Sequence, residues 1–451
     1  MNSHLSLSLQ QAIEQLALGT VTPEQLTEQA LAQISAEDGE GRRAFTQVYA
    51  QWAREQAAAS TARRAADNAI SPIDGVPVSV KDLFDVSGYV TTGGSRVLAE
   101  APAATAHAEI VERLLKAGAV IVGKTNMTEF AYSGLGINPH YGTPANPWDR
   151  TARRIPGGSS SGAAVSVSDD MCFGAVGSDT GGSVRIPAAF CGLTGFKPTA
   201  RRISMAGVLP LSASLDSVGT LARDVASCVA LDAAIAKQPL SLTVKDLSEA
   251  HFAVPQTLVL DGLDAAVSDA FARAIAHLRQ AGATVTEIPL TELSELATIN
   301  ASGGFTALES WAWHKDLIAQ RADDYDPRVV SRIRRGEPLG ETSRQRLVQQ
   351  RTDWQQRVSA RVQQYDALLM PTVPFVAPGI AELEADEELY FRINGAALRN
   401  PSVINFLDGC AVSLPCQAEG AAPVGLMVAA LPMQDEALMS WALEIERCLN
   451  A

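Results

Sequence analysis

Residues 177–185 read GSDTGGSVR, and a second run rich in glycine and serine, PGGSSSG, occupies residues 156–162. Glycine lets the backbone adopt positive φ angles and approach other groups closely. Successive free N–H groups in such a turn form a concave site for an anion. A serine at the end of the turn has its hydroxyl beside these donors, which is the arrangement that acyl transfer requires.

A tight structural turn is the alternative interpretation of these runs, and Gly-Gly-Ser alone favours it. Two runs of the same character weaken that alternative, because Ser159 and Ser183 stand 24 residues apart within them. Nine of the 34 glycines also fall within residues 156–200, a tenth of the chain. We therefore treat both serines as candidates for chemistry.

A serine nucleophile needs a base, and none of the six histidines, at positions 4, 107, 140, 251, 277 and 314, lies within either run. The nearest, His140, is in a predicted loop, where a surface or packing role is favoured. Lys81 directly follows the apolar run VPVSV at residues 76–80, which predicts that it lies near the interior. Burial disfavours the charged amine and lowers its pKa. A fall to 7–8 costs about 4 kcal/mol, which a fold tolerates mainly where it serves function. A surface-reaching lysine paired with Asp82 or Asp85 is an equally favoured alternative.

The rest of the chain alternates predicted helices and strands. Predicted helices cover residues 5–35, 45–69, 108–118, 264–281, 306–365 and 435–449. Predicted strands cover residues 76–80, 119–122, 252–260, 284–288, 367–372 and 424–429, and residues 133–162 are loop-like. Strands interleaved with helices indicate an α/β sheet covered on both faces. We expect one large domain rather than two.

Residues 118–125, GAVIVGKT, match the pattern of a phosphate-binding loop. That motif requires a strand before its first glycine and a flexible loop between its two glycines. Here the four intervening residues are themselves a predicted strand, and Gly118 has the position of a helix C-cap. The sequence therefore argues against nucleotide binding at this segment.

The chain resembles the amidase signature enzymes. The resemblance is carried by residues 74–82 (DGVPVSVKD), 123–127 (GKTNM), 156–162, 177–185 and 195–199 (GFKPT). It implies a single α/β domain over residues 1–451, with a mixed, twisted sheet of about eleven strands between helices on both faces. A helical segment, residues 1–70, would precede the signature core, residues 71–220. Residues 221–451 would complete the sheet and the substrate pocket.

The resemblance also implies a Ser-Ser-Lys triad. Ser183 would attack an amide carbonyl, and Ser159, on a cis peptide in the family, would relay its proton to neutral Lys81. The oxyanion would be held by backbone N–H groups, those of Thr180, Gly181, Gly182 and Ser183. Supporting residues would be Asp179, Arg185 and Ser160, with contact to a substrate carboxylate as the alternative role of Arg185. Ser161 departs mildly from the family, where glycine is usual nearby. Neither a metal nor an organic cofactor is implied.

The substrate pocket is less well defined by the sequence. We expect it to involve four side chains after the GKT segment: Met127, Phe130, Tyr132 and Trp148. Trp311 and Trp313 have a spacing that is more typical of core residues. The arginines within residues 331–335 could bind an anionic substrate, although a solvated helix face is favoured.

The function expected from this resemblance is hydrolysis of a carboxylic amide to a carboxylate and ammonia or an amine, through a serine acyl-enzyme. One alternative is the glutaminase component of the tRNA-dependent amidotransferase, its A subunit, which works with B and C subunits. In that component, an acidic residue binds the ammonium group of glutamine. Our alignment places Leu398, before Asn405, at the position of that acidic residue. A catalytically inactive binding module is a third alternative, and the complete set of Lys81, Ser159 and Ser183 argues against it. Relatives are often homodimers.

The amino-acid composition indicates which kinds of partner the protein can bind and which cellular compartment it occupies. Lys and Arg number 36 and Asp and Glu number 50, giving a net charge of −14, which argues against direct nucleic-acid binding or attraction to anionic membranes. The six cysteines form no zinc-binding spacing, and their density is typical of a reducing compartment. The chain also has no secretory signal pattern and no apolar stretch of eighteen residues. We therefore expect a cytoplasmic protein with a small-molecule amide substrate.

Overall fold

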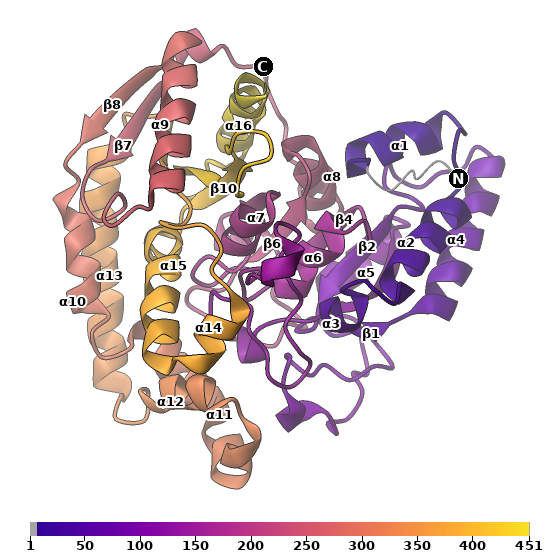
Figure 1. The fold of residues 1–451 in the computed structure, drawn as a ribbon, viewed down its shortest axis with the longest axis horizontal. Helices are drawn as coiled ribbons and strands as arrows, with labels where there is room; N and C mark the ends of the chain where they lie inside the picture. Colours follow the sequence, from indigo (N-terminus) through magenta and orange to yellow (C-terminus); the bar gives the residue numbers. More distant parts are fainter. Residues whose placement is uncertain (1–6, 451) are drawn as a thin grey trace.

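The computed structural model describes residues 7–450, so His4 and the first two residues of the predicted 5–35 helix lie outside the described residues. Figure 1 shows a continuous mixed sheet with helices packed around it, and its eleven strands follow the order β1-β3-β2-β4-β6-β5-β10-β11-β9-β7-β8. The strands are β1 (Phe45–Val48), β2 (Pro77–Lys81), β3 (Val120–Thr125), β4 (Gly174–Ser178), β5 (Thr194–Lys197), β6 (Val218–Ala222), β7 (His251–Pro255), β8 (Thr284–Ile288), β9 (Ala367–Pro371), β10 (Cys410–Pro415) and β11 (Gly425–Ala430).

Helices cover both faces of this sheet. Residues of α5, α8, α9 and α16 join the buried clusters on one face, and residues of α2, α4, α6, α7, α13 and α15 join those on the other. The helices are α1 (Leu9–Ala17), α2 (Pro23–Ser35), α3 (Gly41–Ala44), α4 (Ala50–Ala65), α5 (Glu109–Lys116), α6 (Ser161–Ser168), α7 (Arg185–Cys191), α8 (Val225–Ile235), α9 (Ala265–Gln280), α10 (Glu295–Ile299), α11 (Gly304–Arg321), α12 (Pro327–Arg334), α13 (Glu341–Val362), α14 (Ile380–Ala385), α15 (Glu387–Leu407) and α16 (Asp435–Leu449).

The central strands are buried on both faces, and β11 illustrates the consequence. Leu426 and Val428 pack into the cluster that includes α16, whereas Met427 and Ala429 pack into the cluster that includes α13 and α15. Successive side chains of a strand point to opposite faces, so a strand covered on both sides reads as a continuous apolar run. This confirms the predicted α/β sheet with both faces covered.

Strands of the 71–220 segment and strands of the 221–451 segment meet in this one sheet, because β5 pairs with β10. In Figure 1 the N-terminal strands lie on the right and β7 and β8 lie on the left. The continuity of the ladder across the two segments supports the proposal of a single domain.

The largest departure from the predicted elements is at residues 45–69. We expected one helix there, but Phe45–Val48 form β1 and the helix begins at Ala50. β1 pairs antiparallel with β3, a partner nearly eighty residues away whose contacts override local helix propensity. The long helix α15 and the strands β5, β6 and β10 also have no counterpart among the predicted elements.

The segment resembling a phosphate-binding loop is a strand, as predicted. Residues Val120–Thr125 form β3, and Gly118, with φ +80°, follows the end of α5. Among residues 7–450, none of the helices combines the length and the apolar character that crossing a bilayer requires.

Candidate active site

Lys81 and Ser178 end two neighbouring parallel strands, β2 and β4, at the same edge of the sheet. Lys81 Nζ lies 2.7 Å from Ser159 Oγ and 2.9 Å from Ser178 Oγ, within hydrogen-bond distance of both hydroxyls. The structure therefore brings Lys81 and Ser159 together across 78 residues of sequence. Ser178 was not singled out from the sequence, although it stands directly before Asp179 at the end of an apolar run.

The Lys81 side chain is completely buried. Burial lowers the pKa of its amine from 10.5 to about 7, and the carboxylates of Asp179 and Asp216 offset only part of that effect. Pairing with Asp82 is wrong as an alternative, because Asp82 forms a buried ion pair of 2.9 Å with Lys124. Asp85 instead accepts a hydrogen bond from Thr91. A large share of Lys81 amines is thus neutral near pH 7.

The turn that carries Ser159 is held by backbone hydrogen bonds on both sides. The Gly158–Ser159 peptide bond is cis, and the preceding residue, Gly157, has a φ of +77°, which favours glycine. The Gly158 N–H donates to the carbonyl of Gly134 at 2.8 Å, and the Ser159 carbonyl accepts from the N–H of Thr128 at 3.0 Å. Helix α6 begins two residues later, at Ser161.

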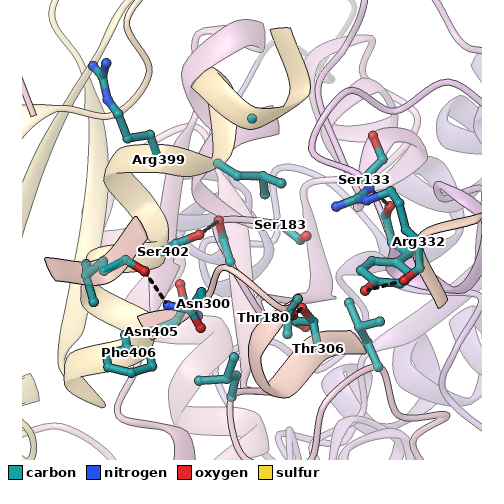
Figure 2. A pocket seen from close by; sticks show the side chains of 18 of the residues that line it. Ser133, Thr180, Ser183, Asn300, Thr306, Arg332, Arg399, Ser402, Asn405 and Phe406 are labelled. Atoms are coloured by element: carbon teal, nitrogen blue, oxygen red, sulfur yellow. Dashed lines mark hydrogen bonds between the residues drawn. The ribbon is translucent and has the colours of Figure 1, made fainter. Parts of the chain in front are cut away.

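Ser183 lies against this turn and is 2% exposed. The N–H of Ser160 donates to the Ser183 carbonyl at 3.2 Å, which joins the two glycine-rich runs. Within residues 7–450, the Ser183 hydroxyl has no hydrogen bond to Ser159 Oγ or to another protein group. Figure 2 shows Ser183 between the helices that surround a cavity, which its side chain helps to line.

The loop between β4 and α7 is organised by the carboxylate of Asp179. It accepts the N–H of Gly182 at 2.8 Å and the N–H of Val184 at 3.1 Å. Gly182 was predicted as an oxyanion donor, and this is wrong for the structure, because its N–H is already bonded. In the described part of the chain, the N–H groups of Thr180, Gly181 and Ser183 have no acceptor, so they are the ones available to an oxyanion.

Arg185 is fully buried and belongs to the same network. Its guanidinium donates to both carboxylate oxygens of Asp179 at 2.9 and 3.0 Å and to Asn405 Oδ1 at 2.6 Å. Burial alone would raise the pKa of the Asp179 carboxyl, but Arg185 holds it well below its usual range. These contacts are those of a residue that supports the turn, and Arg185 is not among the residues lining the cavity.

The cavity beside Ser183 has a volume of about 390 Å³ and is mostly apolar. Tyr132 is the only one of the four predicted pocket side chains that lines it. Met127 is buried in the core, Phe130 packs against His314 and Tyr325, and Trp148 lies beneath Arg154. The remaining lining side chains come chiefly from the 221–451 part, which was expected to complete the pocket: Leu296, Ala297, Asn300, Thr306, Arg332, Leu398, Arg399, Ser402, Asn405 and Phe406.

The structure also locates Leu398 and His140, two residues outside the triad that were considered from the sequence. Leu398 lines the cavity, close enough that a side chain at Gly181 would meet its Cδ2 atom at 3.5 Å. His140 lies elsewhere, with Nε2 2.7 Å from the buried Glu129 carboxylate. Within residues 7–450 no group of three or more His, Cys, Asp or Glu side chains has the arrangement of a metal site.

The site contains the Ser183 hydroxyl, three main-chain N–H groups without an acceptor among residues 7–450, and a buried amine bonded to the Ser159 hydroxyl. A family model described as amidase matches residues 25–439. The 2-amino-5-chloromuconic acid deaminase of Comamonas testosteroni is 36% identical to this chain over 418 residues, which cover 89% of this chain and 88% of that protein. The glutamyl-tRNA(Gln) amidotransferase A subunit of Symbiobacterium thermophilum is 34% identical over 466 residues, which cover 94% of each chain. A crystal structure of an amidase matches 98% of this chain and 99% of its own, with a TM-score of 0.89 at 30% identity.

Proposed function

The chain belongs to the amidase signature family of hydrolases that act on carbon–nitrogen bonds, and we propose that it hydrolyses a small carboxylic amide without a partner protein. Lys81, Ser159 and Ser183 form the catalytic triad of this proposal. The observation that carries it is the fully buried Lys81 amine, with a pKa lowered to about 7 and Ser159 Oγ at 2.7 Å. An uncharged lysine in contact with a hydroxyl is a base that can act near neutral pH.

In the first half of the reaction, Ser183 Oγ attacks the amide carbonyl carbon. Its proton passes to Ser159 Oγ, while the Ser159 proton passes to neutral Lys81 Nζ. The carbonyl oxygen becomes an oxyanion, which accepts hydrogen bonds from the free N–H groups of Thr180, Gly181 and Ser183. Donors fixed before the reaction stabilise this charge without reorganisation, and each is worth a factor of about 10²–10³ in rate.

In the second half, the relay returns its proton to the leaving nitrogen as the C–N bond breaks, giving ammonia or an amine and an acyl ester on Ser183. A water molecule then attacks the ester and delivers its proton along the same path. The ester bond breaks, the carboxylate leaves and the Ser183 hydroxyl is restored. The Ser183 hydroxyl has no hydrogen bond to Ser159 in the structure, and catalytic contacts of this kind commonly tighten only when substrate binds.

The glutaminase component of the amidotransferase is the second candidate, because the relatives include the A subunit of the glutamyl-tRNA(Gln) amidotransferase. Glutamine carries an ammonium group, which needs an anionic partner when it is removed from water. No Asp or Glu is among the residues lining the described cavity, and Leu398 stands where an acidic residue was expected. This composition supports a free-standing amidase. The deaminase relative, whose name gives an acid as its substrate, is consistent with this choice.

The test is ammonia or amine release by the purified chain from a panel of small amides. We expect turnover without any added protein, and loss of turnover in Lys81→Met. Inactivity across the panel, with glutaminase activity that appears only when B- and C-type subunits are added, would support the amidotransferase instead. Both functions allow a homodimer. Light scattering on the same sample measures the oligomeric state.

A further inference from the structure

The charged side chains around the cavity are all cationic. Arg332 and Arg399 line it, and Arg332 and Arg335 line a second hollow of about 490 Å³. Neither hollow has an Asp or Glu among its lining residues within residues 7–450, although the chain as a whole has a net charge of −14. A site with only positive charge, in an acidic protein, favours an anionic ligand.

The two hollows are adjacent. They share three lining residues, namely Arg332, Gly395 and Leu398. The second hollow is also lined by Ser331 and Arg335, which are exposed, so it lies at the surface. Arg332 therefore borders both the surface hollow and the cavity that Ser183 lines.

The guanidinium of Arg332 has few protein partners. It donates through Nη1 to the carbonyl of Tyr132 and stacks over the Tyr132 ring at 4.4 Å. In the described part of the chain it has no carboxylate within 4.0 Å, whereas Arg328, one turn earlier on α12, pairs with Asp326 at 2.8 Å. Arg332 is half-buried, and a partly desolvated cation with unused donors is stabilised by an anion.

Arg399 is a weaker candidate for contact with a substrate. Its Nε donates to Asn400 Oδ1, its buried Nη2 has no partner among the described residues, and burial lowers the pKa of its guanidinium while Asp261 raises it. In Figure 2 its side chain points away from Ser183, whereas the guanidinium of Arg332 is turned toward Ser183. The geometry thus favours Arg332 as the anion-binding group.

We infer that the substrate is an amide whose acyl part also carries a carboxylate, bound by Arg332 while the amide carbonyl lies at Ser183. This inference rests on the proposed amide hydrolysis. A guanidinium matches a planar carboxylate through two parallel N–H donors. The atoms between the two groups lie against an apolar wall formed by Leu211, Leu215, Leu258, Leu296 and Leu398. The substrate class is therefore a monoamide of a dicarboxylic acid with a largely apolar chain.

Matched pairs of amides test this inference. Each pair is a monoamide of a four-, five- or six-carbon dicarboxylic acid and the neutral amide of the same length that ends in a methyl group. A charge-assisted hydrogen bond contributes about 1.5–3 kcal/mol, so the anionic member should have a kcat/KM about 10–100-fold higher. Arg332→Gln should remove this preference, and Arg332→Lys should retain part of it.

Arg334→Gln is the matched control, because Arg334 is exposed on the same helix and lines neither hollow. The control should keep the wild-type preference. Equal kcat/KM for both members of every pair in the wild type, or a preference that survives in Arg332→Gln, would overturn the inference.

A binding measurement separates this inference from the proposed reaction. Calorimetry with the Ser183→Ala protein measures the affinity for each member of a pair without turnover. We expect the anionic member to bind about 10–100-fold more tightly than the neutral member, and we expect Arg332→Gln in the same protein to abolish this difference. That result supports the substrate class even if the wild type hydrolyses nothing. The absence of such binding overturns the substrate class, whereas hydrolysis of the neutral amides would leave the proposed reaction in place.

Discussion

Replacing Lys81 by methionine should abolish activity and remove a pH-dependent penalty on the stability of the folded protein. The pKa of Lys81 falls from 10.5 in an exposed setting to about 7 in the folded chain. Each factor of ten corresponds to about 1.4 kcal/mol, so folding with a protonated Lys81 costs about 5 kcal/mol well below pH 7 and about 4 kcal/mol at pH 7. Methionine fills similar space without a charge, and this penalty disappears.

The sign of the pH dependence follows from where the proton is bound. Between pH 7 and 10.5 the unfolded chain holds the Lys81 proton and the folded chain has released it. The unfolded state therefore binds more protons, and the wild type gains stability as pH rises through this window. At pH 10 the penalty falls to about 1 kcal/mol, so the stability of Lys81→Met relative to the wild type should fall by about 3 kcal/mol between pH 7 and 10.

The assay is urea unfolding of the wild type and Lys81→Met at several pH values. The quantity compared is the difference between the two proteins in free energy of unfolding. Lost hydrogen bonds to Ser159 and Ser178 cost about 1–3 kcal/mol for each hydroxyl left without a partner. That cost is nearly independent of pH, so the change in the difference reports the ionisation alone. Lys116→Met is the control, since Lys116 is exposed and pairs only with Glu112 at the surface.

A difference in stability that stays constant from pH 7 to 10 would refute the reasoning, because Lys81 would then ionise alike in both states. The same pKa gives a kinetic expectation. The value of kcat/KM should rise with pH through an acid limb centred near pH 7 and then level off, because only neutral Lys81 acts as the base. A rate that is flat from pH 5 to 9 would contradict that role.

Three further substitutions test the remaining parts of the site. Ser183→Ala should abolish turnover and labelling by a fluorophosphonate probe, and undiminished labelling detected by mass spectrometry would reject Ser183 as the nucleophile. Asp179→Asn should lower the free energy of unfolding by about 3–5 kcal/mol in denaturant titrations, because it leaves the buried Arg185 without its counter-ion; a loss below 1 kcal/mol would show that the pair is dispensable. Ser178→Ala removes an acceptor that favours the charged form of Lys81, so the acid limb should move to lower pH by about one unit, and a shift to higher pH would contradict this account.

The sequence predicted the parts of the site that depend on local chemistry. Glycines where two backbone segments approach closely, and a lysine at the end of an apolar strand, can be recognised in the sequence. Each of these patterns depends only on residues within a few positions along the chain. The competing role of Lys81 as a partner of Asp82 was left open, since the answer depends on Lys124, on the adjacent strand β3. Such pairing across strands has no local signal.

The part of the chain that completes the cavity was expected, but most of its individual lining side chains were missed for a related physical reason. Its walls include Leu296 on α10 and Leu398 on α15, and apolar side chains at helical spacing look the same whether they face a core or a substrate. Phe130 and Met127 were assigned to the pocket because they follow a signature motif, but they belong to the core. A solvated helix face was favoured for the arginines within residues 331–335, but α12 packs against α15 through Arg328 and Tyr390, and Arg332 lines the cavity.

The network around Asp179 explains how a buried carboxylate can stand next to a site where negative charge develops. An unpaired anion there would oppose oxyanion formation strongly in a low-dielectric interior. Arg185 neutralises the carboxylate, and Asn405, which also lines the cavity, donates to it at 2.9 Å. Because Asp179 accepts the N–H of Gly182, the loop is fixed with the N–H groups of Thr180, Gly181 and Ser183 lacking an acceptor among the described residues. The Asp179–Arg185 pair thus has two effects. It fixes the loop that presents the N–H donors, and it neutralises the Asp179 charge that would oppose oxyanion formation. Asn405 joins this pair to the C-terminal half of the chain.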